Sequence, residues 1–387
     1  MLKRGLGCAA EAAAAGLLLA SCSRPSPAPA PPPDPSVLLV TLDTTRADRI
    51  GAFGGAAVPT PSLDAIAREG VRFDEATSQV PLTLPSHATI LTGRYPASHG
   101  VRHNGAYRLR DSETTLAERF RDAGFETAAF VGAFVLNRQY GTSQGFGTYD
   151  DVDVDRYQGG RDVQFEAQRT ADDVNARVLD WLDRRKPGRF FAWVHYYDPH
   201  LPYAPPESDA RTLRGSGYDR EISYLDACFG DLVRALRGRG LLDTTIVAVA
   251  GDHGESLGEH REVSHGVFLY EGALRVPMMI RAPGRVPVGS VVHGPAGLVD
   301  LAPTLLELAG MKPTPGTEGR SLLPRILGRD DGRDAPVFAE TYMPRIEFGW
   351  SELHMVRDER FKYILAPRPE LYDLKDDPKE EPRETRN

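Results

Sequence analysis

Short apolar runs alternate with amphipathic stretches along most of this chain. Largely apolar runs, typical of strands buried on both faces, occur at residues 37–42, 127–131, 190–194 and 245–250, and residues 71–73 predict a further strand. Stretches with helical spacing separate them, at residues 61–70, 83–92, 115–123, 171–184, 221–237 and 299–308. This alternation predicts an α/β sandwich, with helices on both sides of a mostly parallel sheet.

The pattern changes near residue 336. The phrases FAETYM, DERFKYIL and ELYDLKDDPKEE follow one another there, and they predict short antiparallel strands. We therefore expect a body over residues 36–335 and a small C-terminal α+β subdomain over residues 336–387. With 41% hydrophobic and 26% charged residues, the 387-residue chain has the composition of a globular protein with a large core.

The N-terminus has the pattern of an export signal. Lys3 and Arg4 precede an Ala- and Leu-rich run that ends in the letters LASC, which predicts a signal peptide over residues 1–22. LASC resembles a bacterial lipobox, and this resemblance implies lipidation of Cys22 and a membrane anchor of acyl chains. An ordinary signal peptide or a misassigned start is the alternative. Residues 23–35 are rich in proline and predict an extended spacer.

The stretch PLTLPSHATILTGR, residues 81–94, predicts a nucleophile at the start of a helix. Thr83 stands two residues before Pro85, which suits a first helical turn, and Gly93 can end the helix. Backbone N–H groups at such an end attract anions. The Thr83 hydroxyl could therefore attack a tetrahedral ester, provided that a metal ion lowers the cost of forming the alkoxide.

A candidate metal site comes from two strands far apart in the sequence. Asp43 follows the first apolar run, and Asp252 and His253 follow the run at 245–250. Functional groups gather where parallel strands end, so we expect these side chains to lie together. Two carboxylates, an imidazole and the Thr83 hydroxyl are suitable ligands for a divalent ion, which would also lower the pKa of Thr83.

These motifs resemble those of the sulfatase family within the alkaline phosphatase superfamily. Its signature, C-x-P-S-R-x-x-x-x-T-G-R, is matched here at Pro85, Ser86, Thr92, Gly93 and Arg94. The phrases LLVTLDTTRADRIG and GDHGESLGEH resemble the two metal-binding phrases of the family. The resemblance implies the sulfatase fold and metal-binding roles for the aspartates within these two phrases.

Several positions depart from the pattern of true sulfatases. Thr83 stands where a Cys or Ser is converted to formylglycine, and His87 replaces the arginine. Thr44 replaces a second aspartate, and His253 stands where many sulfatases have asparagine. The KWH element is absent, because residues 131–136 read VGAFVL. At these positions the chain is similar to phosphonate and phosphodiester hydrolases and to phosphoethanolamine transferases. We expect one divalent ion per site, Mn, Zn, Ca or Mg, and the imidazole favours Mn or Zn more than the Ca common in sulfatases.

The resemblance implies three further site residues. His200, in a segment that looks like the family's HxPY region, would bind the ester or protonate the leaving group. His265 stands near the position of a catalytic lysine in many sulfatases, and Asn104 matches a position that contacts substrate oxygens. Alternatively, Asp198, His200 and His265 could hold a second metal ion.

We therefore expect a metal-dependent hydrolase of phosphate, phosphonate or sulfate esters, with Thr83 as direct nucleophile. Its substrate would be a small-molecule, lipid-headgroup or glycan ester. The location would be the bacterial cell envelope, lipid-anchored on the periplasmic side or at the outer membrane. Transfer to an alcohol or a lipid headgroup, or a non-catalytic binding role in the envelope, are the alternatives. The net charge of −8 argues against nucleic acid as a partner.

Overall fold

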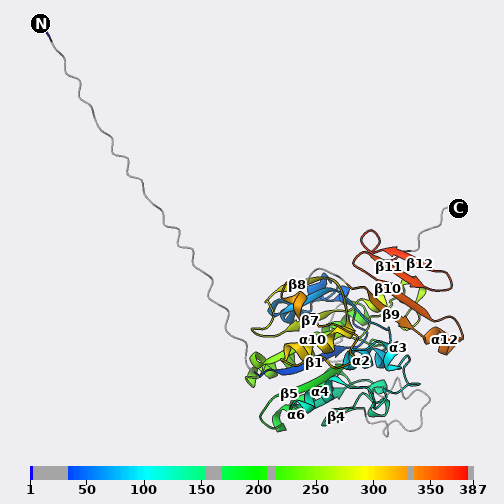
Figure 1. Cartoon of the computed structure of the whole chain (residues 1–387), viewed down its shortest axis with the longest axis horizontal. Coiled ribbons are helices and arrows are strands. Elements are labelled where there is room, and N and C mark those ends of the chain that lie inside the picture. The colour runs from blue at the N-terminus through cyan, green and yellow to red at the C-terminus, as the bar shows by residue number, and fades with distance from the viewer. Residues whose placement is uncertain (3–33, 153–167, 207–214, 330–334, 382–387) are drawn as a thin grey trace. The chain divides into compact units, whose positions relative to one another are not determined.

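The computed structural model describes residues 1–2, 34–152, 168–206, 215–329 and 335–381. The helices and strands belong to one compact unit, Pro31–Asn387. Its main sheet has eight strands in the order β4-β3-β5-β1-β6-β7-β2-β8 (Figure 1). These strands are β1 (Ser36–Leu42), β2 (Val71–Thr77), β3 (Glu126–Val131), β4 (Thr148–Asp150), β5 (Phe190–Tyr196), β6 (Thr245–Gly251), β7 (Met278–Arg281) and β8 (Ser290–Gly297).

The main sheet is mostly parallel. Strand β1 lies between β5 and β6 and pairs with both in parallel. Strand β7 is antiparallel to both of its neighbours, β6 and β2, while β2 and β8 pair in parallel. This arrangement confirms the predicted α/β class and the mostly parallel sheet.

Helices cover both faces of the sheet. They include α1 (Pro61–Glu69), α2 (Thr83–Thr92), α3 (Pro96–His99), α4 (Leu116–Asp122), α6 (Ala171–Arg184), α8 (Gly217–Gly238), α9 (Glu271–Leu274), α10 (Leu301–Leu308), α11 (Leu323–Ile326) and α12 (Met343–Phe348). Strand β1 is buried throughout because its side chains alternate between two cores. Val37 and Leu39 pack in the core with α2, α4 and α10, whereas Leu38 and Val40 pack in the core with α1, α6 and α8.

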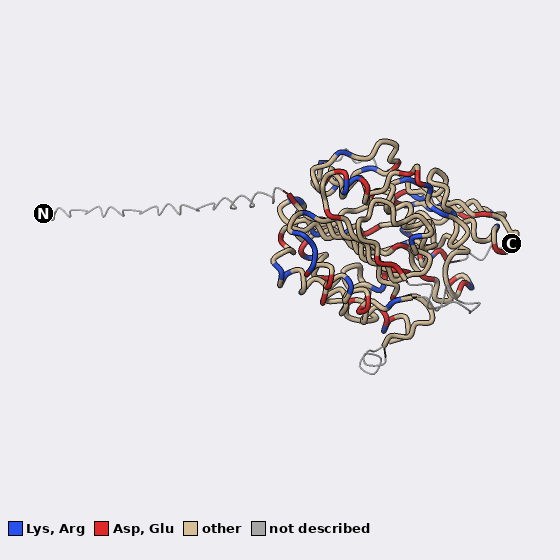
Figure 2. Tube along the Cα trace, turned by 90° about the horizontal axis from the view of Figure 1, so that it is seen from below, with Lys and Arg blue, Asp and Glu red and all other residues tan. Residues whose placement is uncertain are grey.

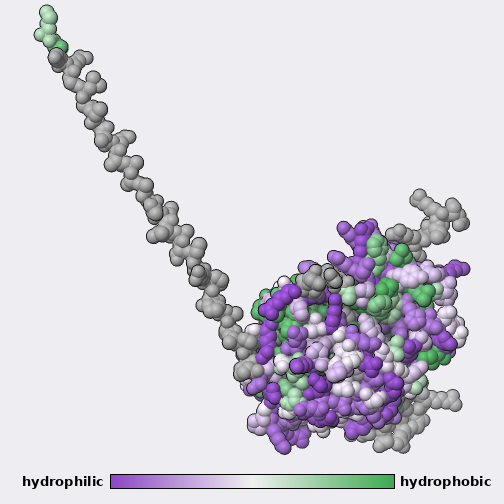
Figure 3. All heavy atoms as spheres, viewed as in Figure 1, coloured by the Kyte–Doolittle hydropathy of each residue, from purple (hydrophilic) through white to green (hydrophobic). Residues whose placement is uncertain are grey.

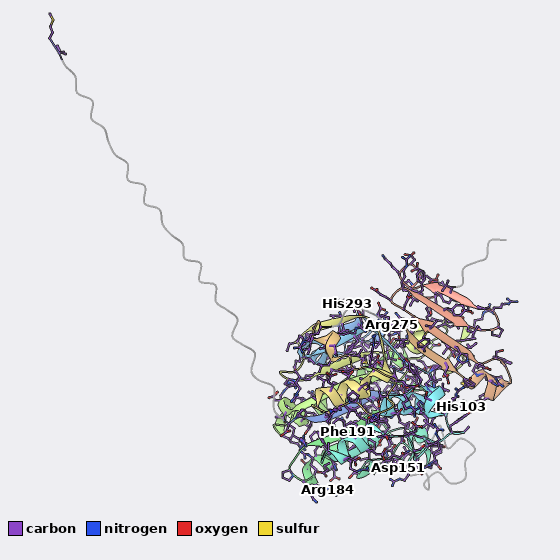
Figure 4. The ribbon with its side chains drawn as sticks, in the orientation of Figure 1. His103, Asp151, Arg184, Phe191, Arg275 and His293 are labelled. Carbon is purple, nitrogen blue, oxygen red and sulfur yellow. The ribbon has the colours of Figure 1, made fainter. Side chains whose placement is uncertain are left out.

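Phe191 on β5 illustrates this layered packing. It is fully buried in the first of these cores and stacks against Phe120 of α4, with ring centroids 4.7 Å apart. In Figure 4 it lies inside the fold, whereas Arg184, at the end of α6, lies at its rim. The central strands are therefore held between helices on both sides, which fixes the positions of the loops at their ends.

Capping side chains set several helix boundaries. Helix α8 begins at Gly217, earlier than the predicted start at residue 221, because Ser216 and Asp219 form a capping box. Thr115 and Glu118 form the same arrangement at α4. Thr60 and Pro61 have the pattern of an N-cap and a first-turn proline for α1, but the Thr60 hydroxyl accepts from the N–H of Gly51 and does not cap the helix.

A second, antiparallel sheet follows near the C-terminus. Its order is β12-β11-β10-β9, with β9 (Val337–Thr341), β10 (Leu353–Arg357), β11 (Phe361–Leu365) and β12 (Glu370–Asp373). One cross-strand row, Phe338, Val356, Tyr363 and Leu371, runs over all four strands on the less buried face. Figure 3 shows hydrophobic side chains gathered on the surface in this region. The small C-terminal sheet was predicted, and it is confirmed.

The remaining predictions about the ends and the surface have different outcomes. Cys22 and the proline-rich segment up to residue 33 lie outside the described residues, so lipidation and the spacer stay predictions. Among the described helices, none has the length and apolar character needed to cross a bilayer. Basic and acidic residues are interspersed along the described chain (Figure 2), and the expectation of no nucleic-acid partner stays a prediction.

Candidate metal and nucleophile site

Two neighbouring strands bring the candidate metal ligands together. Asp43 directly follows β1, Asp252 directly follows β6, and the two strands pair in register up to Leu42 and Gly251. The pairing continues into the site, because the N–H of Asp252 donates to the carbonyl of Leu42 at 3.1 Å. Both carboxylates are fully buried. The fold therefore brings these residues together at one edge of the sheet, as predicted.

Thr83 is the first residue of α2 and faces this pair. Pro85 occupies the first turn, and Gly93 ends the helix in the left-handed conformation with φ 66°. The Thr83 Oγ1 lies 3.3 Å from Nε2 of His253, and its residue is 2% exposed. The hydroxyl thus stands both at a helix N-terminus and beside the candidate ligands, as the sequence predicts.

The ligand atoms have the spacing of a metal site. Nε2 of His253 lies 3.6 Å from Oδ1 of Asp43 and 3.6 Å from Oδ2 of Asp252. Four ligands at the bond lengths of zinc would be about 3.4 Å apart around a tetrahedral ion. The separations among these donors, including the 3.3 Å to Thr83, therefore fit one small divalent cation.

The unpaired atoms of the site also fit a cation. Both carboxylate oxygens of Asp43 and Oδ2 of Asp252 are buried without a hydrogen-bond partner in the described structure. Burial and the neighbouring Asp43 hold the pKa of Asp252 well above its usual value. For Asp43, burial alone raises the pKa, but the imidazoles of His195, His200 and His253 outweigh it and the pKa is lowered. A divalent ion would stabilise both carboxylates as anions.

The backbone around Asp252 orients its carboxylate. Oδ1 accepts the N–H of Thr44 at 3.2 Å and the N–H of His253 at 2.7 Å, so Oδ2 is left for a ligand role. Thr44 has φ 47°, a strained conformation for threonine that costs about 1–3 kcal/mol. The hydroxyls of Ser78 and Ser86 both donate to the carbonyl of Asp252, at 2.6 and 2.7 Å.

The imidazole of His253 is prepared for coordination. Its Nδ1 lies 2.9 Å from the carbonyl oxygen of Gly254. A carbonyl can only accept, so Nδ1 carries the proton and Nε2 keeps its lone pair. Burial, reinforced by the neighbouring His265, lowers the pKa of His253 to about 3, and the ring is therefore neutral. A neutral ring with a bare Nε2 is the form that binds metal ions.

His200 and His265 lie next to this group. The ring of His265 is 4.4 Å from that of His253 and 5.4 Å from that of His200, measured between centroids. Glu255 holds His265 through a contact of 3.0 Å between Oε1 and Nδ1. Burial alone lowers the pKa of His265, but this carboxylate overrides it and the pKa is raised. Burial lowers the pKa of His200.

Asn104 also reaches the nucleophile helix. Its Oδ1 accepts the N–H of Leu84 at 2.9 Å, so it satisfies one of the free backbone donors beside Thr83. Asn104 and the six other residues that the sequence predicts for catalysis or metal binding therefore lie in one region. The six are Asp43, Thr83, His200, Asp252, His253 and His265.

The alternative prediction of a second metal ion at Asp198, His200 and His265 is wrong for Asp198. Oδ2 of Asp198 accepts the N–H of Ala171 at the start of α6, at 2.8 Å. Its carboxyl also interacts with Glu221, whose pKa burial and the Asp198 charge raise to about 9. Asp198 thus holds the start of α6 and interacts with a second acid, and it belongs to neither group of described residues that is spaced to hold a metal ion.

Sequence reasoning missed three buried residues at the site, namely His87, His195 and Glu255. His195 stands near the end of β5 and is fully buried, and Glu255 lies two residues beyond His253. The usable signal was positional, because β5 pairs with β1 and places His195 opposite Thr41, two residues before Asp43. A histidine near the C-terminal end of a central parallel strand therefore belonged among the candidates.

The comparisons with known proteins agree with the fold. The sulfatase family profile matches residues 35–311. The chain belongs to the sulfatase family. Residues 258–384 additionally match the profile described as N-sulphoglucosamine sulphohydrolase, C-terminal. The resemblance inferred from the motifs is confirmed.

The individual relatives have low sequence identity to this chain, but the alignments cover most of its length. An arylsulfatase of Clostridium perfringens is 26% identical over 89% of this chain and 89% of its own length. An ulvan-active sulfatase of Formosa agariphila is 27% identical over 80% of this chain and 68% of its own. The phosphonate monoester hydrolase of Agrobacterium radiobacter shares the fold, with a TM-score of 0.76, 24% identity and coverage of 89% of this chain and 90% of that one.

Family membership fixes the general chemistry. The relatives are hydrolases of ester bonds, and this chain is a hydrolase of that kind. Enzymes of the family use a divalent metal ion, and the buried group of Asp43, Asp252 and His253 can hold one.

Proposed function

We propose that this chain hydrolyses phosphate or phosphonate esters with the Thr83 hydroxyl as direct nucleophile. A divalent ion held by Asp43, Asp252, His253 and Thr83 itself completes the site. The observation that carries the proposal is the position of Thr83 Oγ1, at the N-terminus of α2 and 3.3 Å from Nε2 of His253. A hydroxyl in this place is oriented by its helix and adjoins the cation.

The identity of the nucleophile favours phosphorus over sulfur. Formylglycine forms from Cys or Ser, whose β-carbon carries two hydrogens, whereas the β-carbon of Thr83 carries a methyl group. The segment at 131–136 also lacks the lysine and histidine of the KWH element of sulfatases. Aryl sulfates are therefore the poorer substrates, and phosphorus esters the better ones.

The reaction proceeds in two displacements. The Thr83 hydroxyl releases its proton to solvent, Oγ1 attacks phosphorus, an Oγ1–P bond forms, and the bond from phosphorus to the leaving oxygen breaks. His200 or His265 gives a proton to the leaving oxygen, a role suited to an imidazole. Water then attacks phosphorus and gives one proton to the imidazole, the Oγ1–P bond breaks, and Oγ1 of Thr83 takes a proton back from solvent. The products are the alcohol, the phosphate or phosphonate, and free Thr83.

The remaining residues bind and orient. Asn104 fixes the start of α2 through Leu84 and stands where substrate oxygens arrive. The backbone N–H groups at that helix end favour the negative charge of the phosphoryl oxygens. When bound, the divalent ion lowers the pKa of the nucleophile and polarises a phosphoryl oxygen.

We further propose that the enzyme acts in the bacterial cell envelope, anchored by a lipidated Cys22. The LASC sequence and the preceding apolar run support this location. Mass spectrometry of the membrane-extracted protein tests it. The mature chain should begin at an acylated Cys22, and Cys22→Ala should release the protein from membranes. Retention of that variant on membranes would contradict the lipid anchor.

A substrate panel tests the chemistry. The metal-loaded protein and Thr83→Ala are incubated with aryl phosphate monoesters, aryl phosphate diesters, aryl phosphonates and aryl sulfate. We expect turnover of at least one phosphorus ester by the wild-type protein and none by Thr83→Ala. Sulfate turnover that survives the substitution, or phosphorus turnover that does so, would contradict the nucleophile assignment.

A further inference from the structure

Two fully buried imidazoles, His87 and His195, lie behind the proposed metal group. One nitrogen of each and a carboxylate oxygen of Asp252 all lie within 4.8 Å of one another. Such a cluster has two chemically distinct explanations. It can bind a second cation, or it can hold the carboxylates of the first cation by hydrogen bonds. The hydrogen-bond partners of each ring distinguish the two.

His87 has no lone pair left for a metal ion. Its Nδ1 lies 2.7 Å from the carbonyl oxygen of Thr83, which can only accept, so Nδ1 carries the proton. Its Nε2 lies 2.9 Å from the hydroxyl of Thr41. That hydroxyl accepts the indole N–H of Trp193 at 2.9 Å and is free to donate its own proton to Nε2. The chain of bonds fixes His87 as a neutral donor to the backbone of Thr83.

A second cation would have to break one of the two bonds of His87, because it would take one of the ring nitrogens. The ring is enclosed, with Trp193 at 5.2 Å and His195 at 4.9 Å between ring centroids. Loss of a satisfied hydrogen bond in a buried place is costly. The second of the two explanations is therefore favoured, and the remaining question concerns His195.

His195 has no hydrogen-bond partner at either nitrogen in the described structure, although its side chain is fully buried. Its Nε2 lies 3.5 Å from Oδ2 of Asp43. The sheet fixes this approach, because His195 pairs with Thr41 and the N–H of Asp43 donates to the carbonyl of Tyr196 at 3.0 Å. The ring can reach Asp43 with a small adjustment.

The two oxygens of Asp43 thus face different imidazoles. Oδ1 lies 3.6 Å from the bare Nε2 of His253, on the side where the ion belongs. Oδ2 lies on the side of His195. A cation shared with His253 on the Oδ1 side and an N–H donor on the Oδ2 side would fix the rotation of the carboxylate. Carboxylate ligands of metal ions are commonly held by hydrogen bonds of this kind.

We propose that His195 is a positioning residue that donates its Nε2–H to Oδ2 of Asp43 and thereby turns Oδ1 toward the metal ion. This inference rests on the metal site of the proposed function, but not on the nature of the ester. Loss of such an outer hydrogen bond typically weakens metal binding by 10–100-fold. The site holds one ion per chain, and His195 is not a ligand of it.

A pair of variants of similar length tests the donor role. His195→Gln keeps an N–H donor, whereas His195→Met removes it. His99→Met is the control, because His99 is another buried histidine with satisfied partners, Thr89 and the N–H of Val101, outside the metal group. For each purified full-length protein, Mn²⁺ and Zn²⁺ affinities are measured by chelator competition, and bound ions are counted by elemental analysis.

We expect one ion per wild-type chain and a 10–100-fold weaker affinity in His195→Met. His195→Gln should stay within about threefold of wild type, as should His99→Met. The melting temperatures of the metal-free proteins show whether each variant is folded. If His195→Met does not fold, the folded His195→Gln variant decides alone, and a tenfold loss of affinity there would contradict the donor role.

Two other results would overturn the inference. Two ions in the wild type with one lost in His195→Met would make His195 a ligand. Unchanged affinity in a folded His195→Met would leave it a packing residue only. Neither result bears on Thr83, whose role is measured by turnover. If the wild type binds no divalent ion, the proposed function and this inference both fail.

Discussion

At the scale of single residues, the site depends on polar atoms that the fold leaves unpaired. Asp43 and Asp252 contribute three buried oxygens without partners, whereas the nearby Ser78 and Ser86 hydroxyls are both satisfied. Buried polar groups are otherwise almost always hydrogen-bonded. Other buried atoms without partners lie scattered among the described residues, but these three oxygens lie together at the place where a cation belongs.

Asn104 gives a test at this scale that separates capping from substrate contact. Asn104→Asp keeps an oxygen acceptor for the N–H of Leu84, but it replaces the amide N–H₂ by a second anionic oxygen. We expect folding stability within about 1 kcal/mol of wild type. We also expect kcat/KM for phosphorus esters to fall by about 100-fold, because the carboxylate repels the phosphoryl oxygens.

Urea unfolding and steady-state kinetics of Asn104→Asp measure the two quantities separately. Asn104→Ala should lose stability as well as activity, since it also removes the cap. Full activity in Asn104→Asp would show that the side chain acts only as a cap.

At the scale of elements, the sequence indicated the strands that carry the site but not the whole sheet. The runs that became β1, β5 and β6 are continuous and apolar, because these strands are buried on both faces. Strand β8, with the sequence SVVHGPAG, contains glycine, proline and histidine and lacks such a signal. Strand β7 has only four residues, too few for a periodicity.

As with the strands, only some residues of the site could be predicted from the sequence. Asp43, Asp252 and Thr83 could be found because each directly follows a strand or begins a helix with a recognisable pattern. His87 and His195 could not be assigned in this way, because their roles depend on pairing between β1 and β5 and on hydrogen bonds to Thr41. The register of a sheet and the direction of a side chain are tertiary properties, and a single sequence does not encode them locally.

The C-terminal sheet is attached to the main body by a buried ion cluster. Nζ of Lys362, on β11, lies 3.0 Å from Glu271 and 2.7 Å from Glu380. Its side chain is fully buried. Glu380 also accepts the N–H of Glu271 at 2.6 Å, which ties the end of the described chain to the start of α9.

Lys362→Met should destabilise the protein by about 3–5 kcal/mol, because two buried carboxylates lose their shared cation. Lys375→Met, at an exposed position, is the control and should change stability by less than about 0.5 kcal/mol. Urea unfolding gives both values. Equal stability of the two variants would mean that the cluster contributes little to attachment.

At the scale of the whole molecule, acid should weaken this attachment. For Glu271, burial alone raises the pKa, but Arg357 and Lys362 outweigh it and lower the pKa to about 2. Its folded pKa lies below the ordinary value of 4.5, so the stability that it contributes is present above pH 4.5 and is lost as the pH falls toward 2.

The difference between wild type and Glu271→Gln isolates this contribution from that of Glu380, whose burial raises its pKa and acts in the opposite direction. Unfolding free energies are measured across that pH range. The wild type should lose stability with falling pH more steeply than Glu271→Gln. Parallel pH profiles would contradict the assigned pKa.

Metal binding should also change global stability. A ligand at a thousandfold excess over its dissociation constant stabilises a fold by about 4 kcal/mol. Chelation should therefore lower the melting temperature of wild type. Asp252→Asn should not respond to metal or chelator, yet its metal-free form should be at least as stable as metal-free wild type, since the substitution removes a buried carboxyl whose charge is disfavoured. A metal response retained in Asp252→Asn would exclude this residue as a ligand.

The central claim, that Thr83 attacks the substrate directly, is tested most directly by trapping the covalent intermediate. Metal-loaded protein is mixed with the best phosphorus ester, quenched in acid during turnover and digested, and the peptide that contains residues 81–94 is analysed by mass spectrometry. We predict a phosphoryl or phosphonyl group on Thr83 that is absent without substrate. Modification of Ser86, or turnover with an unmodified Thr83 under every quench, would contradict the account.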